Sequence, residues 1–182
     1  MKSSHQRTRV LLVHPLGYRA DAAGGDIARF ANIMPPIGLA SLAAWLDAQG
    51  FETTLVDCYA KPDSAARIRE ILQDRRPDFL GLSCTTSSFL DGARLAGEAR
   101  VLRPGIRTVV GGPHVSALQA ASIRDFPAFD FAVVGEGEQT LAELVSGGWE
   151  RPAAVQGLVT RLAEMAAEAA KAIKATAASA GA

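Results

Sequence analysis

Four short segments of this chain carry the residue types that hold polar ligands. His14-Pro15, Ser83–Ser88, Gly111–His114 and Gly135–Glu138 each follow directly on a run of mainly apolar residues. Their hydroxyls, carboxylates and imidazoles form hydrogen bonds, and their glycines let the backbone approach a bulky group. This combination suits a ligand with amide, ribose and phosphate groups. It does not suit hydrolysis, because no Ser/His/Asp or Cys/His arrangement is evident in the sequence.

The apolar runs before these segments are predicted to be buried strands of one parallel sheet. They are almost uninterrupted rather than alternating, which is typical of strands covered on both faces. The carboxyl ends of parallel strands meet at one edge, which is where open α/β sheets bind their ligands. The predicted strands are Arg9–His14, Glu52–Cys58, Phe79–Ser83, Arg107–Val110 and Phe129–Val134.

Helical patterns between these strands complete five βα units. Because crossovers of this kind are right-handed, the units predict an α/β fold of flavodoxin-like (Rossmann-like) type. The expected sheet is five-stranded and parallel, with the order 2-1-3-4-5 and helices on both faces. The predicted helices are Ile37–Gln49, Ser64–Arg75 with Asp63 or Ser64 as its cap, Ser88–Leu102, Ala117–Arg124 and Gln139–Val145.

Two segments depart from this alternation. Leu16–Met34 is a long loop between the first strand and the first helix, and loops of that length in compact domains are usually functional or mobile. Arg161–Ala182 contains 11 alanines in 22 residues, so propensity alone predicts a helix there. We therefore expect one ligand-binding domain over residues 1–159 and an alanine-rich helical tail over residues 160–182, whose role the sequence leaves open.

Charge and composition argue against several classes of partner. Lys and Arg number 19, and so do Asp and Glu, so no overall field favours nucleic acid or an anionic membrane. Aromatic residues make up 6% of the chain, which argues against a platform for base stacking. Cys58 and Cys84 are far apart and are expected to be reduced thiols. With no apolar run long enough to span a bilayer, these features predict a cytoplasmic protein.

Taken together, the segments resemble the cobalamin-binding domain at the N-terminus of B12-dependent radical SAM enzymes. The resemblance runs in register over residues 9–159. The segments that carry it are VLLVHP at 10–15, PPIGLASLA at 35–43, PDFLGLS at 77–83, GGPHVS at 111–116 and FDFAVVGEGE at 129–138.

The resemblance implies a cobalamin, as hydroxocobalamin or methylcobalamin, lying across the carboxyl edge of the sheet. Its nucleotide tail would enter a slot between the loops after the third and fourth strands, where Ser83, Thr85 and the Gly111-Gly112 pair lie. Residues 86–110, 25 in number, separate these two loops, which leaves room for the helix and strand between them. The cofactor-binding residues implied in this way are His14, Pro15, Ser83, Thr85, Thr86, Gly111, Gly112, Pro113, His114, Val115, Glu136 and Gly137.

Two motifs known from related proteins are absent from this sequence, and each limits the expected function. A D-x-H-x-x-G motif, whose histidine binds cobalt in much of the superfamily, is not found in the Leu16–Met34 loop. The resemblance therefore implies cobalamin held base-off without a histidine ligand. Cys58 and Cys84 cannot form the C-x-x-x-C-x-x-C motif that holds the [4Fe–4S] cluster of radical SAM enzymes. We expect the chain alone to bind the cofactor, without catalytic residues, protein metal ligands or an Fe–S cluster, and to present it to a radical SAM catalytic module.

Other interpretations stay open on the sequence alone. The same fold would serve a non-catalytic cobalamin sensor or a protein-interaction module. A flavodoxin or a receiver domain is less favoured, because the first loop lacks a Ser/Thr-rich phosphate cradle and the third strand ends in Ser83 rather than an aspartate. Ser83, Thr85 and Thr86 could instead cap the helix that follows, and Ser87 or Ser88 is expected to cap it. His14 and His114 are expected to form hydrogen bonds rather than to bind metal.

Overall fold

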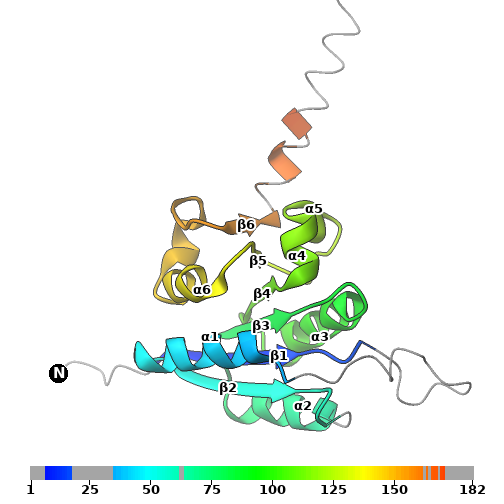
Figure 1. Cartoon of the computed structure of the whole chain (residues 1–182), viewed down its shortest axis with the longest axis vertical. Helices are drawn as coiled ribbons and strands as arrows, with labels where there is room; N and C mark the ends of the chain where they lie inside the picture. The colour runs from blue at the N-terminus through cyan, green and yellow to red at the C-terminus, as the bar shows by residue number, and fades with distance from the viewer. Residues whose placement is uncertain are drawn as a thin grey trace, which may run out of the picture.

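The computed structural model describes residues 7–17, 35–61, 64–161, 163, 165–167, 169 and 170 of the 182-residue chain. Within these residues the strands form one six-stranded sheet in the order β2-β1-β3-β4-β5-β6 (Figure 1). Strands β1 to β5 are parallel to their neighbours, whereas β6 is antiparallel to β5. The strands are β1 (Arg9–His14), β2 (Glu52–Asp57), β3 (Phe79–Ser83), β4 (Arg107–Gly111), β5 (Phe131–Val133) and β6 (Leu158–Thr160).

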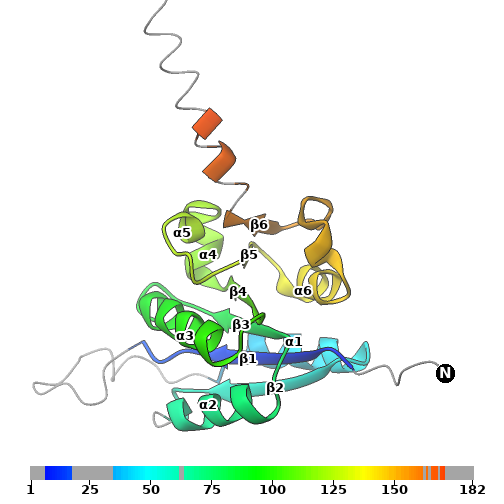
Figure 2. The ribbon, with the colours of Figure 1, turned by 180° about the vertical axis from the view of Figure 1, so that it is seen from behind.

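Helices cover both faces of the sheet and divide the interior into two cores. Helices α1 and α6 pack on one face, and α2, α3, α4 and α5 pack on the other (Figures 1 and 2). Two 3-10 turns, η2 and η3, connect α6 to β6. These elements are α1 (Ile37–Ala48), α2 (Ser64–Asp74), α3 (Phe89–Leu102), α4 (Pro113–Leu118), α5 (Ala121–Arg124), α6 (Gly137–Val145), η2 (Gly148–Glu150) and η3 (Pro152–Ala154).

The predicted parallel strands and their order are confirmed, and the side chains of β1 show why the apolar run forms a central strand. Leu11 and Val13 join the core beneath α2 and α3, whereas Val10 and Leu12 join the core beneath α1 and α6. All four side chains are at most 1% exposed. Successive side chains of a strand point to opposite faces of the sheet. A strand that is buried on both faces must therefore be apolar throughout, as this segment is.

The number of strands differs from the prediction, because Leu158–Thr160 forms a sixth strand. β6 lies antiparallel to β5, with Val159 opposite Ala132. Its side chains alternate between the two cores, so Leu158 packs against one and Val159 against the other. Gly157, at a φ of +76°, lies immediately before this strand. The sheet is therefore mixed, and the edge of β5 is covered rather than open.

The predicted helix over 117–124 is instead two short helices. α4 already begins at Pro113, and it ends before Gln119, whose φ of +50° interrupts the helical path. α5 then covers Ala121–Arg124. The first of these helices starts immediately after the Gly111-Gly112 pair, so the proline and the glycines form a direct junction between strand and helix.

Both irregular segments of the prediction extend beyond the described residues. Most of the predicted long loop falls on residues 18–34, which lie outside them. In the predicted tail, the described residues 161, 163, 165–167, 169 and 170 are all helical. The boundary between residues 159 and 160 stays a prediction. Among the described helices, none has both the length and the apolar character that a bilayer crossing requires.

Candidate functional site

A cavity of about 580 Å³ opens at the carboxyl edge of the sheet. One wall is formed by the sheet face of β1, β3, β4 and β5, and the opposite wall by α1 and α6. The loops after β1, β2, β3, β4 and β5 surround its mouth. Its volume falls within the range of about 300–1,000 Å³ that is usual for small-molecule sites. The carboxyl ends of the parallel strands therefore meet at a site that reaches deep into the domain.

Eight of the twelve residues predicted from the sequence line this cavity, and they come from four separate loops. The convergence follows from the parallel register, in which Ser83 at the end of β3 lies opposite Gly111 at the end of β4. The prediction that these strand ends form one edge is thus confirmed. The eight residues are His14, Ser83, Thr85, Gly111, Gly112, Pro113, Glu136 and Gly137.

The other four predicted residues lie outside the cavity lining. Val115 is fully buried in the core beneath α3, and Pro15 is also buried. His114 stacks against Phe89 with ring centroids 4.1 Å apart, and its Nδ1 lies 3.2 Å from Oγ1 of Thr86. Thr86 and His114 therefore connect the β3 and β4 loops on the side of α3, away from the cavity.

Gly112 is the position at which the β3 and β4 loops come closest. Its φ is +96°, and a Cβ there would lie 2.8 Å from the carbonyl oxygen and 2.9 Å from the amide nitrogen of Cys84. The backbone bonds beside it join the loops, because Cys84 N–H donates to Gly111 O at 2.9 Å and His114 N–H donates to Cys84 O at 3.2 Å. Only glycine fits this conformation and this approach.

The hydroxyl-rich segment after β3 forms its own hydrogen-bonded turn. The amide of Thr85 donates to Oγ of Ser88 at 3.0 Å, and Oγ1 of Thr85 lies 3.0 Å from Oγ of Ser87. Ser88 occupies the cap position of α3, but its hydroxyl makes no capping bond to the helix. Ser83 and Thr86 lie before this cap position. Thr85 and Ser87 thus lie at the cavity mouth rather than capping the helix.

His14 is held at the cavity rim by residues from the end of β2 that the sequence analysis did not single out. Its Nδ1 lies 3.3 Å from Oδ1 of Asp57, and its ring stacks on Tyr59 with centroids 4.8 Å apart. The amide of Tyr59 donates to the same Asp57 oxygen at 3.0 Å. The Tyr59 hydroxyl accepts a bond from the amide of Gly17 at 3.1 Å. This network orders the rim, as expected for a hydrogen-bonding histidine.

The deep part of the cavity was also missed by sequence reasoning. Gly81, in the middle of β3, lies between Leu12 of β1 and Val109 of β4 in the sheet register. A Cβ at Gly81 would lie 2.7 Å from Cδ2 of Leu12, so the bare backbone there keeps this end of the cavity open. The signal that could have found it is a glycine inside an apolar strand, which often marks close approach of a ligand. The deep lining comprises Leu12, Leu39, Leu42, Gly81, Leu82, Val109, Val133 and Leu141.

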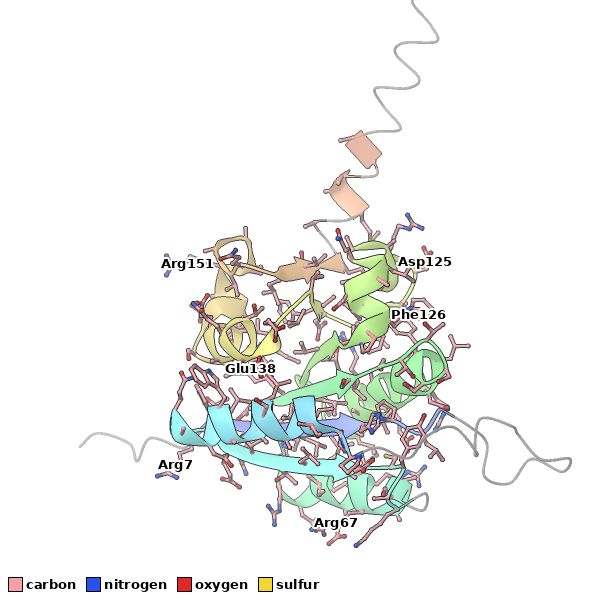
Figure 3. All side chains as sticks on the ribbon, viewed as in Figure 1. Arg7, Arg67, Asp125, Phe126, Glu138 and Arg151 are labelled. Carbon is pink, nitrogen blue, oxygen red and sulfur yellow. The ribbon has the colours of Figure 1, made fainter. Side chains whose placement is uncertain are left out.

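Helices α1 and α6 are joined across the outer wall of the cavity. Oγ of Ser41 donates to Oε1 of Glu138 at 2.9 Å, and the Glu138 side chain lies on the side of α6 that faces α1 (Figure 3). Close by, a Cβ at Gly137 would lie 3.2 Å from Cδ2 of Leu42. Glu136 precedes the helix at its cap position and is exposed. Glu138 therefore contributes to the wall, while Glu136 stays available to a ligand at the mouth.

Both cysteines are buried and lack the character of nucleophiles. Burial raises the pKa of the Cys84 thiol to about 12 and that of the Cys58 thiol to about 11, the latter helped by the charge of Asp57. Thiols with raised pKa values are protonated at neutral pH and react slowly. Across the part of the chain that the structure describes, no group of three or more His, Cys, Asp or Glu residues is arranged to hold a metal ion.

The chemistry of the cavity is that of a binding site for an elongated ligand. Among the described residues, apolar side chains and the Gly81 backbone line its deep end, and its mouth offers hydroxyls, an imidazole, carboxylates and glycine backbone. Such a site suits a molecule with an apolar ring at one end and hydroxyl, amide or phosphate groups along the rest. The described groups provide positioning rather than bond breaking.

Comparison with known proteins gives a consistent result. A family model described as the B12 binding domain matches residues 25–145. An uncharacterised methyltransferase of Pyrococcus horikoshii is 34% identical over 111 residues, which is 61% of this chain and 24% of that protein. An anaerobic magnesium-protoporphyrin IX monomethyl ester cyclase of Rubrivivax gelatinosus is 33% identical over 139 residues, 76% of this chain and 24% of that protein. This chain thus spans about a quarter of the length of these curated relatives.

Among solved structures, the radical S-adenosylmethionine methyltransferase TsrM from Kitasatospora setae has a similar fold. That structure contains a tryptophan substrate and an S-adenosylmethionine analog. The match has a TM-score of 0.67 at 23% identity and covers 84% of this chain and 28% of the other. It confirms the arrangement of the sheet and its helices.

Proposed function

Because this chain belongs to the family of B12-binding domains, we propose that it holds a cobalamin with the nucleotide tail inserted between the sheet and helices α1 and α6. The corrin ring would then lie across the mouth, over the loops that follow β1, β3 and β4. The observation that carries this proposal is the apolar cavity that reaches from the loop edge to Gly81. A ligand bound only at the surface would not require a glycine at position 81.

The residues present fit the cofactor along the whole of this path. A benzimidazole ring is apolar on both faces and suits the wall formed by Leu12, Val109 and Leu141. Ribose and phosphate oxygens suit the hydroxyls of Ser83 and Thr85 and the backbone at the mouth. When bound, the corrinoid supplies a cobalt centre that can carry a methyl group or take part in radical chemistry. This chain contributes binding, orientation and exclusion of water from the tail.

We further propose that the cofactor is bound base-off and without a histidine ligand. A base inserted beside Gly81 is withdrawn from cobalt, so insertion and base-on coordination exclude one another. His14 is engaged by Asp57 and Tyr59, and His114 lies against Phe89 outside the cavity lining. These contacts support hydrogen-bonding roles for both residues. The hydroxo and methyl forms of the cofactor both fit this mode.

The partner of the loaded domain is proposed to be a radical SAM catalytic module. The support is that a solved structure of similar fold is a radical S-adenosylmethionine methyltransferase, of which this chain covers 28%. The chain likewise covers about a quarter of the curated methyltransferase and cyclase. With Cys58 and Cys84 as its only cysteines, this chain has no cluster motif of its own. The role proposed here is therefore to carry the corrinoid and present it to that module.

The experiment that tests binding is co-elution of hydroxocobalamin with the protein in gel filtration, compared among three variants. We expect the unmodified chain to retain the corrin absorbance. Gly81→Leu should lose it, because the added side chain fills the space between Leu12 and Val109. Gly97→Leu is the matched control, since a Cβ at Gly97 on α3 meets no atom within 4 Å. Circular dichroism checks that each variant is folded.

Two outcomes would overturn the proposal. No corrin absorbance with the folded, unmodified chain would exclude cobalamin binding by this chain. Full retention by folded Gly81→Leu would mean that the tail does not use this cavity.

A further inference from the structure

Building on the proposed function, we infer that the cavity selects corrinoids by the chemistry of their lower base, and that it accepts an apolar aromatic base and rejects a purine. Natural corrinoids share the corrin ring and differ at this base. The ring at the mouth therefore cannot distinguish them. Only the deep end of the cavity meets the part of the ligand that varies.

The walls at the deep end are hydrocarbon on both sides. Leu12 and Val109 flank Gly81 on the sheet, and they are 1% and 3% exposed. Leu39 and Leu141, on α1 and α6, face them and are 3% and 4% exposed. A planar ring inserted beside Gly81 would be in contact with aliphatic side chains on each face.

The polar groups of the described lining are all at the mouth. Ser83 is the last residue of β3, and Thr85 and Ser87 follow it in the loop. The two glutamates of the lining lie at the start of α6. The backbone deeper inside is already engaged, because β3 is paired with β1 on one side and β4 on the other. Among the described residues, no side-chain donor or acceptor lines the cavity around Gly81.

This distribution penalises a purine base. Adenine carries an amino group and ring nitrogens that are hydrogen-bonded in water and would be buried here without partners. Burying one such group without a partner weakens binding by roughly 10- to 100-fold. A cresol base presents only carbon and hydrogen to the walls. Dimethylbenzimidazole adds one ring nitrogen, the one withdrawn from cobalt, whereas adenine buries its amino group and further ring nitrogens as well, so its penalty is the larger. The preference thus arises from weaker binding of the purine rather than from stronger binding of the apolar base.

The test is to measure dissociation constants of the folded chain for four corrinoids. These are cobalamin, cresolylcobamide, adeninylcobamide and cobinamide, which has no nucleotide tail. We expect cobalamin and cresolylcobamide to bind at least about 10-fold more tightly than adeninylcobamide. The cresol base cannot coordinate cobalt, so its affinity reports the cavity without any cost of detaching the base from the metal.

Two matched variants test whether the walls set this preference. Val109→Thr places one hydroxyl beside Gly81, whereas Val110→Thr places the same group in the other core of the same strand. The two variants should show similar decreases in the free energy of unfolding. Only Val109→Thr should narrow the ratio between the affinities for cobalamin and adeninylcobamide, because it offers the purine a partner.

The outcomes separate this inference from the proposed function. If no corrinoid binds, the proposed function fails. If cobalamin and adeninylcobamide bind equally well, and both more tightly than cobinamide, the tail enters the cavity but the selection does not exist. Equal affinity for cobinamide and cresolylcobamide, or an unchanged ratio in Val109→Thr, would also overturn the selection by these walls.

Discussion

Gly112 shows how one residue determines the shape of the candidate site. Its backbone lies against that of Cys84, so the loops after β3 and β4 pack together with no side chain between them. Its neighbour Gly111 lines the cavity, but a Cβ there would meet its nearest atom, the carbonyl oxygen of Val133, at 3.6 Å. Both adjacent glycines line the cavity, but only at Gly112 do the backbone conformation and the approach of Cys84 require the absence of a side chain.

Replacing Gly112 by alanine is expected to destabilise the fold, and replacing Gly111 is not. A non-glycine residue held at a positive φ lowers the free energy of unfolding by about 1–3 kcal/mol. A Cβ at position 112 would also clash with the backbone of Cys84, which lowers it further. Urea unfolding should therefore show a lower free energy of unfolding for Gly112→Ala by at least about 1 kcal/mol. Gly111→Ala is the matched control and should remain near the unmodified chain. Equal stabilities of the two variants would contradict this explanation of the glycine pair.

The buried thiols give a second prediction, on alkaline pH. Burial raises the pKa of Cys84 to about 12 and of Cys58 to about 11, from an ordinary value of 9.0. The folded state thus holds these protons more tightly than the unfolded state does. The resulting stability is fully present below pH 9.0 and is lost as the pH rises through about 11 and 12.

The measurement is the free energy of unfolding as a function of pH for the unmodified chain and for Cys58→Ala/Cys84→Ala. The comparison uses the slope of stability against pH rather than the absolute stability, because the difference in slope between the two chains reports the thiols. The double variant should show a shallower decline. Identical slopes would mean that the thiols do not titrate differently in the folded and unfolded states.

At the scale of elements, most of the fold was predictable because each parallel strand is a local apolar run that ends in a distinct loop. The strand Arg9–His14 was predicted with the bounds that the structure gives it. Strand β6 was missed because Leu158–Thr160 has three residues and forms only through its pairing with β5. A pattern of that length carries no periodicity, so its structure depends on contacts distant in sequence.

The candidate site likewise has one part that the sequence predicts and one part that it does not. Its mouth was predictable, since Ser83 and Gly111 belong to loops whose meeting point follows from the parallel topology. Its depth was not, because Leu12 and Val109 read as ordinary core residues in any apolar strand. Whether such side chains pack against a helix or face a cavity depends on how far α1 and α6 stand from the sheet. That distance is set by tertiary packing, and its one local trace in the sequence is Gly81, a glycine inside an apolar strand.

Strand β6 is expected to stabilise the domain, because it covers the edge of β5 and contacts both cores. A chain that ends at Gln156 loses the pairing of Val159 with Ala132 and the partly buried Leu158. We expect it to be less stable than a chain that ends at Arg161 by about 2 kcal/mol, from the apolar burial alone. Thermal unfolding of the two chains measures this difference. Equal melting temperatures would mean that β6 contributes only a marginal contact.

On the scale of the whole molecule, the domain combines a sheet covered by helices on both faces with a cavity at its carboxyl edge. The described lining of the cavity comes from β1, β3, β4 and β5, from the loops that follow the strands, from helices α1 and α6 and from Pro113 at the start of α4. The opposite face is filled by α2, α3, α4 and α5 and has a closed core. We propose that a catalytic module approaches from the open edge, because only there would the corrin ring remain accessible while its tail is buried.

The absorption spectrum of the protein-bound corrinoid distinguishes a base inserted in the cavity from a base bound to cobalt. Hydroxocobalamin absorbs differently when its own base is bound to cobalt and when that base is withdrawn. We propose that the base is withdrawn from cobalt, and we therefore expect a base-off spectrum for the complex that co-elutes with the chain, unchanged in His14→Ala and in His114→Ala. A base-on spectrum would contradict it, because the base cannot be bound to cobalt and inserted beside Gly81 at the same time.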